Sequence, residues 1–141
     1  MSTRYFALIL GIFYVIVGVL GLFPPLLQAI PAGEPNVFVD FLKGSLLGVF
    51  PVNILHTLVH LVVGIWGIVA YRSFASSRVF SRAIAVIFGV LFVMGIIPVL
   101  RTAFGLIPLY GSDVVLHLVT ALLGGYFGWV VPEEGVIVVR H

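Results

Sequence analysis

The chain contains no cysteine and little charge, and both absences narrow the range of functions. Zero cysteines exclude disulfides, thiolate metal sites and cysteine nucleophiles. Charged residues make up 9% of the 141 positions, whereas soluble proteins have about 25%. The net charge of +2 comes from scattered arginines, so the concentrated basic patch of a nucleic-acid-binding protein is missing. Glycine-rich phosphate loops and the Gly-x-Ser-x-Gly hydrolase motif are also missing. We expect no nucleic-acid partner.

Apolar residues are what the sequence has in excess, at 62% of the chain, against roughly 45–50% in soluble proteins. A water-soluble fold of this length could not bury so much apolar surface. Four segments have the roughly 20 mostly apolar residues that a membrane-spanning helix needs. They cover about 5–23, 52–71, 79–97 and 113–131. The sequence therefore predicts an all-α, integral membrane four-helix bundle, one domain over 1–141, with the lipid bilayer as its surroundings.

The first apolar segment could instead be a cleaved signal peptide. Only Arg4 precedes it, its apolar run is long, and no small-residue cleavage site follows. We expect a retained helix.

Positive charges predict the orientation, because cytoplasmic loops of membrane proteins are enriched in lysine and arginine. Arg72, Arg78 and Arg82 cluster around the connection between the second and third segments, so this connection is predicted to be cytoplasmic. Arg4 and Arg140 share that side. Only Lys43 and Arg101 fall on the other side. Both termini are therefore predicted to be cytoplasmic.

The long outer loop over 24–51 is itself apolar. Asn36, Asp40, Lys43 and Gly44 recur in it at helical spacing, which is typical of a short helix in the headgroup region. An apolar loop packed on the bundle explains the composition equally well. Both interpretations stay open.

Two stretches of the chain resemble each other and indicate an internal repeat. Leu55–Val69 aligns without gaps on Leu116–Val130, and the alignment places equivalent histidines and glycines together: His56 on His117, Gly64 on Gly125 and Gly67 on Gly128. Each half is then an up-down hairpin, with repeat one over 5–72, repeat two over 79–131 and a short tail over 132–141. Halves of the same orientation predict a parallel repeat about an axis along the membrane normal.

The same stretches carry a family resemblance. LLGVFPVNILHTLVHLVVGIWGIVA (Leu46–Ala70) and FGLIPLYGSDVVLHLVTALL (Phe104–Leu123) resemble the domain-of-unknown-function 4383 family over nearly the whole chain. These are small bacterial and cyanobacterial proteins with four predicted spans, and the family implies no activity. Thr57 departs from the asparagine that we associate with the family pattern. The resemblance implies an inner (plasma) or thylakoid membrane.

Ionisable residues inside spanning helices are costly, and by default they indicate a functional site. Asn53, His56 and His60 share one face of the second segment, and Asp113 and His117 are i,i+4 neighbours in the fourth. Both segments start at the outer surface, so His56 and His117 should lie about 6 Å deep and face each other. We predict one site, with these five residues as candidates for binding a cofactor.

Three main interpretations of this site remain open. The residues hydrogen-bond the helices together, or they hold a haem or chlorin through an axial histidine. Alternatively, His56, His60 and His117 bind a metal such as zinc. Thr57 stands where the H-E-x-x-H metalloprotease motif has its glutamate, so hydrolysis is not expected. Movement of protons or a solute along the polar stripe is a further alternative.

Taken together, these patterns predict a non-enzymatic accessory subunit in a larger membrane assembly, photosynthetic or respiratory. The alternatives are a small haem-binding redox protein and a metal-binding membrane protein. Other membrane subunits, or further copies of the chain, are the expected protein partners.

Overall fold

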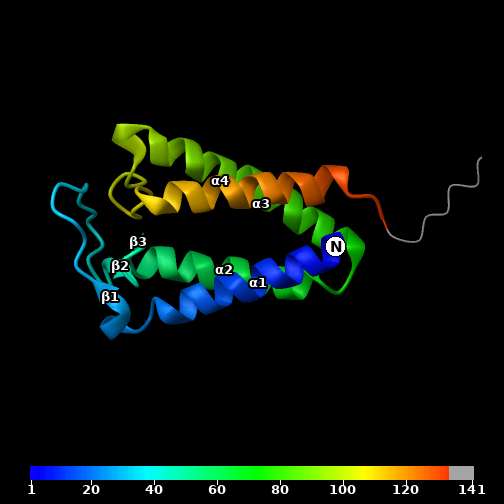
Figure 1. Ribbon diagram of the computed structural model, residues 1–141, viewed down its shortest axis with the longest axis horizontal. Coiled ribbons are helices and arrows are strands. Elements are labelled where there is room, and N and C mark those ends of the chain that lie inside the picture. The colour runs from blue at the N-terminus through cyan, green and yellow to red at the C-terminus, as the bar shows by residue number, and fades with distance from the viewer. Residues whose placement is uncertain (134–141) are drawn as a thin grey trace, which may run out of the picture.

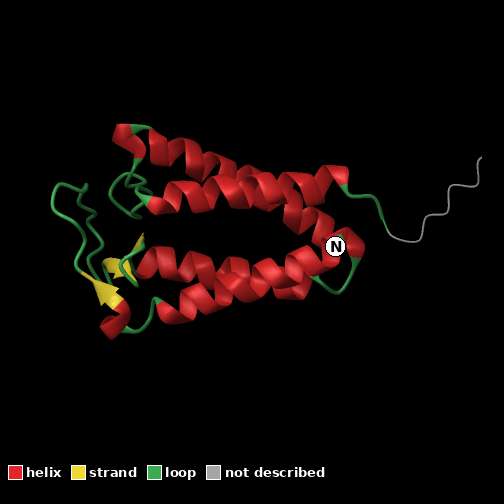
Figure 2. Ribbon diagram, viewed as in Figure 1, coloured by secondary structure: helices red, strands yellow, loops and turns green. Residues whose placement is uncertain are grey.

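The computed structural model describes residues 1–133 (Figures 1 and 2). Arg140 and all but the first two residues of the predicted tail over 132–141 lie outside the described residues. Four α-helices dominate residues 1–133: α1 (Thr3–Leu20), α2 (Ile54–Ala70), α3 (Phe74–Ile96) and α4 (Ser112–Gly125). A π-helical turn at Tyr126–Val130 extends α4, and 3-10 turns at Pro24–Leu26 and Pro98–Leu100 follow α1 and α3.

Polar caps set where the helices begin. Ser2, Asn53 and Ser73 each accept a hydrogen bond from the backbone N–H three residues further on, which satisfies a free donor of the first turn. The cap at Ser73 starts α3 five residues before the predicted Val79. The placement of Arg78 and Arg82 in a loop was therefore wrong, because both lie on α3.

Consecutive helices pair as two hairpins, α1 with α2 and α3 with α4 (Figure 1). Glycines bring the first pair into backbone contact. A Cβ on Gly11 would lie 2.6 Å from the amide nitrogen of Ile68 and 2.7 Å from the carbonyl of Gly64. Gly124 brings α4 equally close to Ser81 of α3. Small residues therefore set the helix separation within each hairpin.

The two hairpins join at the end that contains the N-terminus. A buried cluster from α1, α2 and α3 includes Tyr14, Val63, Phe80 and Phe88. The Tyr14 hydroxyl and Thr120 Oγ1 share a hydrogen bond of 2.9 Å between the hairpins. These contacts fix the position of one hairpin against the other.

The outer loop forms a small antiparallel sheet of three strands, β1 (Leu27–Gln28), β2 (Gly44–Leu46) and β3 (Phe50–Val52), in the order β1-β2-β3. Of the two interpretations left open for this loop, the headgroup helix is therefore wrong, and the fold is all-α only outside this loop. Leu47 and Gly48 join β2 to β3 with positive φ angles, which suits a tight hairpin turn. Leu46 and Val52 pack with Val17 at the end of α1, so the sheet covers the outer end of hairpin one.

The helices expose apolar side chains. Val62 is 66% exposed, Val86 60% and Leu122 65%, as expected for surfaces in contact with lipid. Three helices are long and apolar enough to cross a membrane: α1, α3 and α4 with its π-helical turn. The fourth, α2, is an apolar helix of 17 residues. The structure is that of a membrane protein.

The internal repeat stays a prediction. His56 and His117 take similar places near the starts of α2 and α4. Gly64 and Gly125, which the alignment pairs, differ in their surroundings. A Cβ on Gly64 would meet the backbone of Val15, whereas a Cβ on Gly125 would meet nothing within 4 Å.

Candidate functional site

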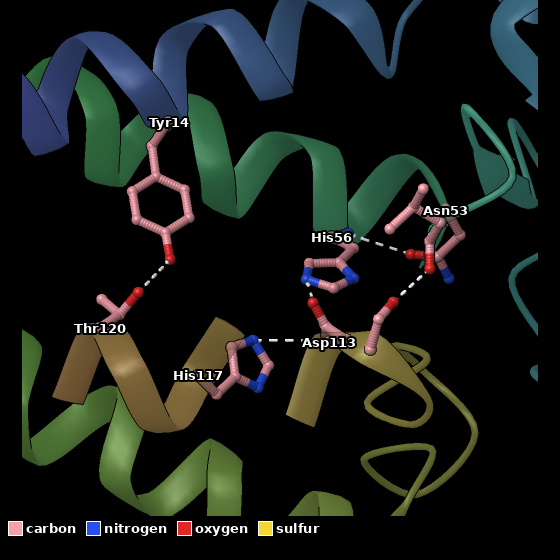
Figure 3. Close-up of polar contacts among 8 residues, drawn as sticks. Tyr14, Asn53, His56, Asp113, His117 and Thr120 are labelled. Carbon is pink, nitrogen blue, oxygen red and sulfur yellow. Dashed lines mark hydrogen bonds and ion pairs between the residues drawn. The ribbon is translucent and has the colours of Figure 1, made fainter. Parts of the chain in front are cut away.

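The first turns of α2 and α4 bring three titratable side chains together between the hairpins (Figure 3). His56 Nε2 lies 3.7 Å from Asp113 Oδ2, and His117 Nε2 lies 3.3 Å from the same oxygen. The imidazole centroids of His56 and His117 are 6.1 Å apart. Each of the three residues offers one potential ligand atom, and these three atoms all lie within 4.8 Å of one another. The predicted convergence of His56 and His117 is seen in the structure, and Asp113 lies between them.

Local structure positions each member of this cluster, which we call the His–Asp cluster (His56, Asp113 and His117). The Asn53 side chain accepts a hydrogen bond of 3.0 Å from the His56 amide and so fixes the first turn of α2. Asp113 lies in the first turn of α4, where the positive end of the helix dipole favours a carboxylate. His117 follows one turn later on the same face.

The three side chains of the cluster are buried, and most of their polar atoms lack hydrogen-bond partners. His56, Asp113 and His117 are exposed by 2% or less. Neither oxygen of Asp113 and neither nitrogen of His117 has a hydrogen-bond partner within residues 1–133. Buried polar atoms normally have such partners. The contacts to Asp113 therefore bring potential ligand atoms close without satisfying them.

His60 lies beside the His–Asp cluster and outside its three-donor group. Its ring centroid is 4.4 Å from that of His56 and 5.2 Å from that of Tyr14. Both of its nitrogens are buried and lack a partner among the described residues. The predicted metal set of His56, His60 and His117 thus differs from the group that the structure assembles, in which Asp113 stands in place of His60. No ligand role is established for any of them.

Asn53, the fifth predicted site residue, forms hydrogen bonds with the two loops at the outer end of the molecule. Its Nδ2 donates to the Val39 carbonyl at 3.2 Å and to the Leu106 carbonyl at 2.6 Å. One buried side chain thus connects the outer loop over 24–51 and the second outer loop, over 97–111, to the start of α2. Sequence spacing placed Asn53 on the histidine face, but the loop carbonyls that it binds could not be read from the sequence.

Further contacts close the outer end, and the sequence analysis did not find them. The Ser112 hydroxyl donates to the Val49 carbonyl, which connects α4 to the outer loop of the other hairpin. Tyr110 lies in the second outer loop and is only 3% exposed. Burial, with a smaller contribution from Glu34, raises the pKa of its hydroxyl.

The architecture and this site define a class: a small helical membrane protein with a buried imidazole–carboxylate cluster between two hairpins. Comparison with known families makes the assignment more specific. The family model described as domain of unknown function (DUF4383) matches residues 4–130, and the chain belongs to this family. The resemblance noted in the sequence is confirmed. No curated protein and no solved structure matches the chain.

Proposed function

We propose that this protein is a four-span, non-enzymatic membrane protein that binds one divalent transition-metal ion, of the zinc class, between its hairpins. His56, Asp113 and His117 are the ligands. The observation that carries the proposal is that one donor atom from each of the three lies within 4.8 Å of the other two.

The two donor separations to Asp113 suit such an ion. Two ligand atoms bound at about 2.1 Å to a tetrahedral zinc ion lie about 3.4 Å apart. The separations of 3.3 and 3.7 Å to Asp113 Oδ2 lie on either side of that value. Two imidazoles and one carboxylate are a ligand set that zinc and iron sites use. The carboxylate also neutralises half of the ion's charge in a region of low dielectric constant.

Purely structural hydrogen bonding is the simplest alternative. It predicts that the cluster satisfies itself, because an unpaired polar group in the membrane interior costs several kcal/mol. The partnerless atoms of Asp113 and His117 do not meet that expectation. An ion would satisfy Asp113 Oδ2 and His117 Nε2 together.

A haem or chlorin is the second candidate, because the His56 and His117 rings face each other at 6.1 Å between centroids. One observation favours the metal ion over it. The Asp113 carboxylate lies within 3.7 Å of both Nε2 atoms, where a ring between the histidines would have to pass.

The test is metal analysis of protein purified in detergent through a tag without histidines. We expect about one zinc-class ion per chain, and a loss of at least about tenfold in Asp113→Asn and His117→Ala, because each change removes one of three protein ligands. Thr120→Val is the matched control, since Thr120 lies on the same face of α4 and bonds Tyr14. Wild-type protein without metal after zinc supply would overturn the proposal.

The absorption spectrum of the same preparation separates the second candidate. A Soret band lost in His117→Ala would select haem or chlorin binding, and a colourless preparation containing zinc selects the metal site. Both measurements use the same purified protein, so neither requires that a partner protein be identified.

The four-span topology and the setting complete the proposal. At 1.5 Å per residue the 17 residues of α2 extend about 26 Å, and 17 residues is the lower end of the range for spanning helices. We place both termini on the cytoplasmic side of an inner (plasma) or thylakoid membrane. The exposed apolar faces fit lipid, and they also fit the predicted role as an accessory subunit beside other membrane subunits or further copies.

A further inference from the structure

Two arginines of α3 share one carbonyl of α4 at the end of the molecule that contains the N-terminus (Figure 1). Arg78 and Arg82 are one helical turn apart, and their Nε atoms donate to the Gly128 carbonyl at 3.3 and 2.8 Å. These are the hydrogen bonds that the two guanidinium groups form within residues 1–133. The terminal nitrogens of both groups are therefore left to bind something else.

Aromatic rings fix the direction of both side chains. Arg82 Cζ lies 5.5 Å from the centroid of the Trp129 ring, and Arg78 Cζ lies 5.1 Å from that of Phe74, where cation–π attraction holds a guanidinium group. A Cβ on Gly128 would lie 2.8 Å from Arg82 Cγ, so the glycine leaves room for the stem of Arg82 against the end of α4. The fold therefore positions both guanidinium groups at the line where α3 meets α4.

The charge of this arginine pair (Arg78 and Arg82) is not neutralised by the described part of the chain. The ion pairs found there involve Asp40 and Asp113 at the opposite end, and neither arginine takes part in one. Within residues 1–133 the end that contains the N-terminus has one carboxylate, Glu133, against four arginines. Like charges one turn apart destabilise a helix. An anion between the two guanidinium groups would remove this repulsion.

The surroundings of the arginine pair are typical of the boundary between lipid headgroups and acyl chains. Val79 is 62% exposed, Trp129 52% and Val130 65%, and tryptophan is enriched at this boundary. A soluble anion would have to approach through the headgroups of the surrounding lipid. The phosphate of a phospholipid is already at this level of the bilayer.

We infer that Arg78 and Arg82 bind the phosphate of an anionic phospholipid, of the phosphatidylglycerol class, at the lipid-facing surface of α3 and α4. Free phosphate oxygens accept from guanidinium N–H groups in a planar, forked geometry, and basic sites between spanning helices bind such headgroups. The excess of positive charge at this end favours a headgroup without an ammonium group. This function is separate from metal binding, because the His–Asp cluster lies at the opposite end of α4. Phospholipids are present in both leaflets, so the inference does not depend on the orientation of the chain.

The test is quenching of tryptophan fluorescence by brominated lipids, with Trp129 as the reporter. A Trp66→Phe background leaves Trp129 as the only tryptophan, beside Arg82. The protein is reconstituted in bilayers of phosphatidylcholine and phosphatidylglycerol, with either lipid brominated, at about 0.15 M salt so that distant charges are screened. We expect phosphatidylglycerol to bind roughly fivefold more strongly, the effect of about one arginine at an anionic surface. Arg78→Gln and Arg82→Gln should each lower this preference, and the double variant should abolish it.

Arg72→Gln is the matched control, because Arg72 is exposed at the same end and the change removes the same charge. It should keep the preference. Arg82→Lys keeps the charge but lacks the planar fork, so it should weaken the preference. An excess of soluble glycerol 3-phosphate should not compete.

Four outcomes contradict the inference. They are equal binding of the two lipids by the protein with both arginines, competition by glycerol 3-phosphate, an unchanged preference in the double variant, and an equal loss of preference in Arg72→Gln. The first two are measured without changing either arginine, so they remain decisive if a glutamine variant does not fold.

Discussion

A single asparagine holds the outer end of this molecule together. Asn53 is completely buried, caps α2 and donates to carbonyls in both outer loops. Its side chain therefore satisfies one backbone amide and two half-buried backbone carbonyls. The geometry of the His–Asp cluster depends on this residue, because the first turn of α2 carries His56.

We predict that Asn53→Ala lowers the free energy of unfolding by at least about 2 kcal/mol. The loss of a helix cap costs about 1 kcal/mol, and the loss of each hydrogen bond to a half-buried carbonyl adds about 0.5–1.5 kcal/mol. Unfolding in mixed detergent micelles measures the change. Asn36→Ala is the control, because Asn36 is exposed in the same loop and should change stability by less than about 0.5 kcal/mol. Equal stability of the two variants would remove the proposed role of Asn53.

Residue spacing alone predicted part of the site. Helical periodicity placed His56 with His60, and Asp113 with His117, because neighbours on one helix face are fixed by the backbone. Asp113 and His56 are 57 positions apart in the chain and lie on different helices. Helical periodicity relates only residues of one helix, so it could not predict their contact. The Tyr14–Thr120 bond was missed for the same reason.

At the scale of helices, glycine position decides how closely the pairs pack. Gly11 faces the backbone of α2, whereas Gly89 of α3 has no atom within 4 Å of a built Cβ. Both glycines are in helix interiors, so an alanine at either position changes helix propensity in the same way. Only the alanine at Gly11 also changes helix packing.

We predict that Gly11→Ala destabilises the protein by about 1–3 kcal/mol, because the added methyl group would overlap backbone atoms that cannot rotate away. The matched Gly89→Ala should leave stability unchanged or raise it by up to about 1 kcal/mol, since alanine is the better helix former. Unfolding of both variants in micelles gives the comparison. A Gly11→Ala protein as stable as wild type would mean that α1 and α2 are not held this closely.

The helices were predictable because their signals are local: long apolar runs, three of which end at a proline. The sheet was not. Asp40 and Lys43 fall at helical spacing in the sequence, yet their side chains meet at 2.5 Å in a turn, and positive φ angles at Leu42 and Leu47 break any helix there. Strands as short as two and three residues leave no period to detect, and their pairing depends on contact with α1.

The whole molecule is electrostatically asymmetric along its length. Arginines gather at the end that contains the N-terminus. Arg4 donates to the Tyr71 carbonyl, and Arg78 and Arg82 donate to the Gly128 carbonyl at the far end of α4. At the opposite end, Lys43 is paired with Asp40. Arg101 also lies at that end. Four of the five arginines within residues 1–133 therefore lie at the end that contains the N-terminus, which is the end predicted to be cytoplasmic.

Single-cysteine labelling tests this orientation cleanly, because the chain has no cysteine of its own. Ala32→Cys places a thiol in the outer loop and Ala75→Cys places one at the start of α3, and both positions are exposed. In intact cells a membrane-impermeant maleimide should label Ala32→Cys alone, with Ala75→Cys reacting only after permeabilisation. The opposite pattern would reverse the orientation while keeping the spans. Labelling of both variants in intact cells would place the ends of α2 on one side of the membrane, and α2 could then not be the fourth span.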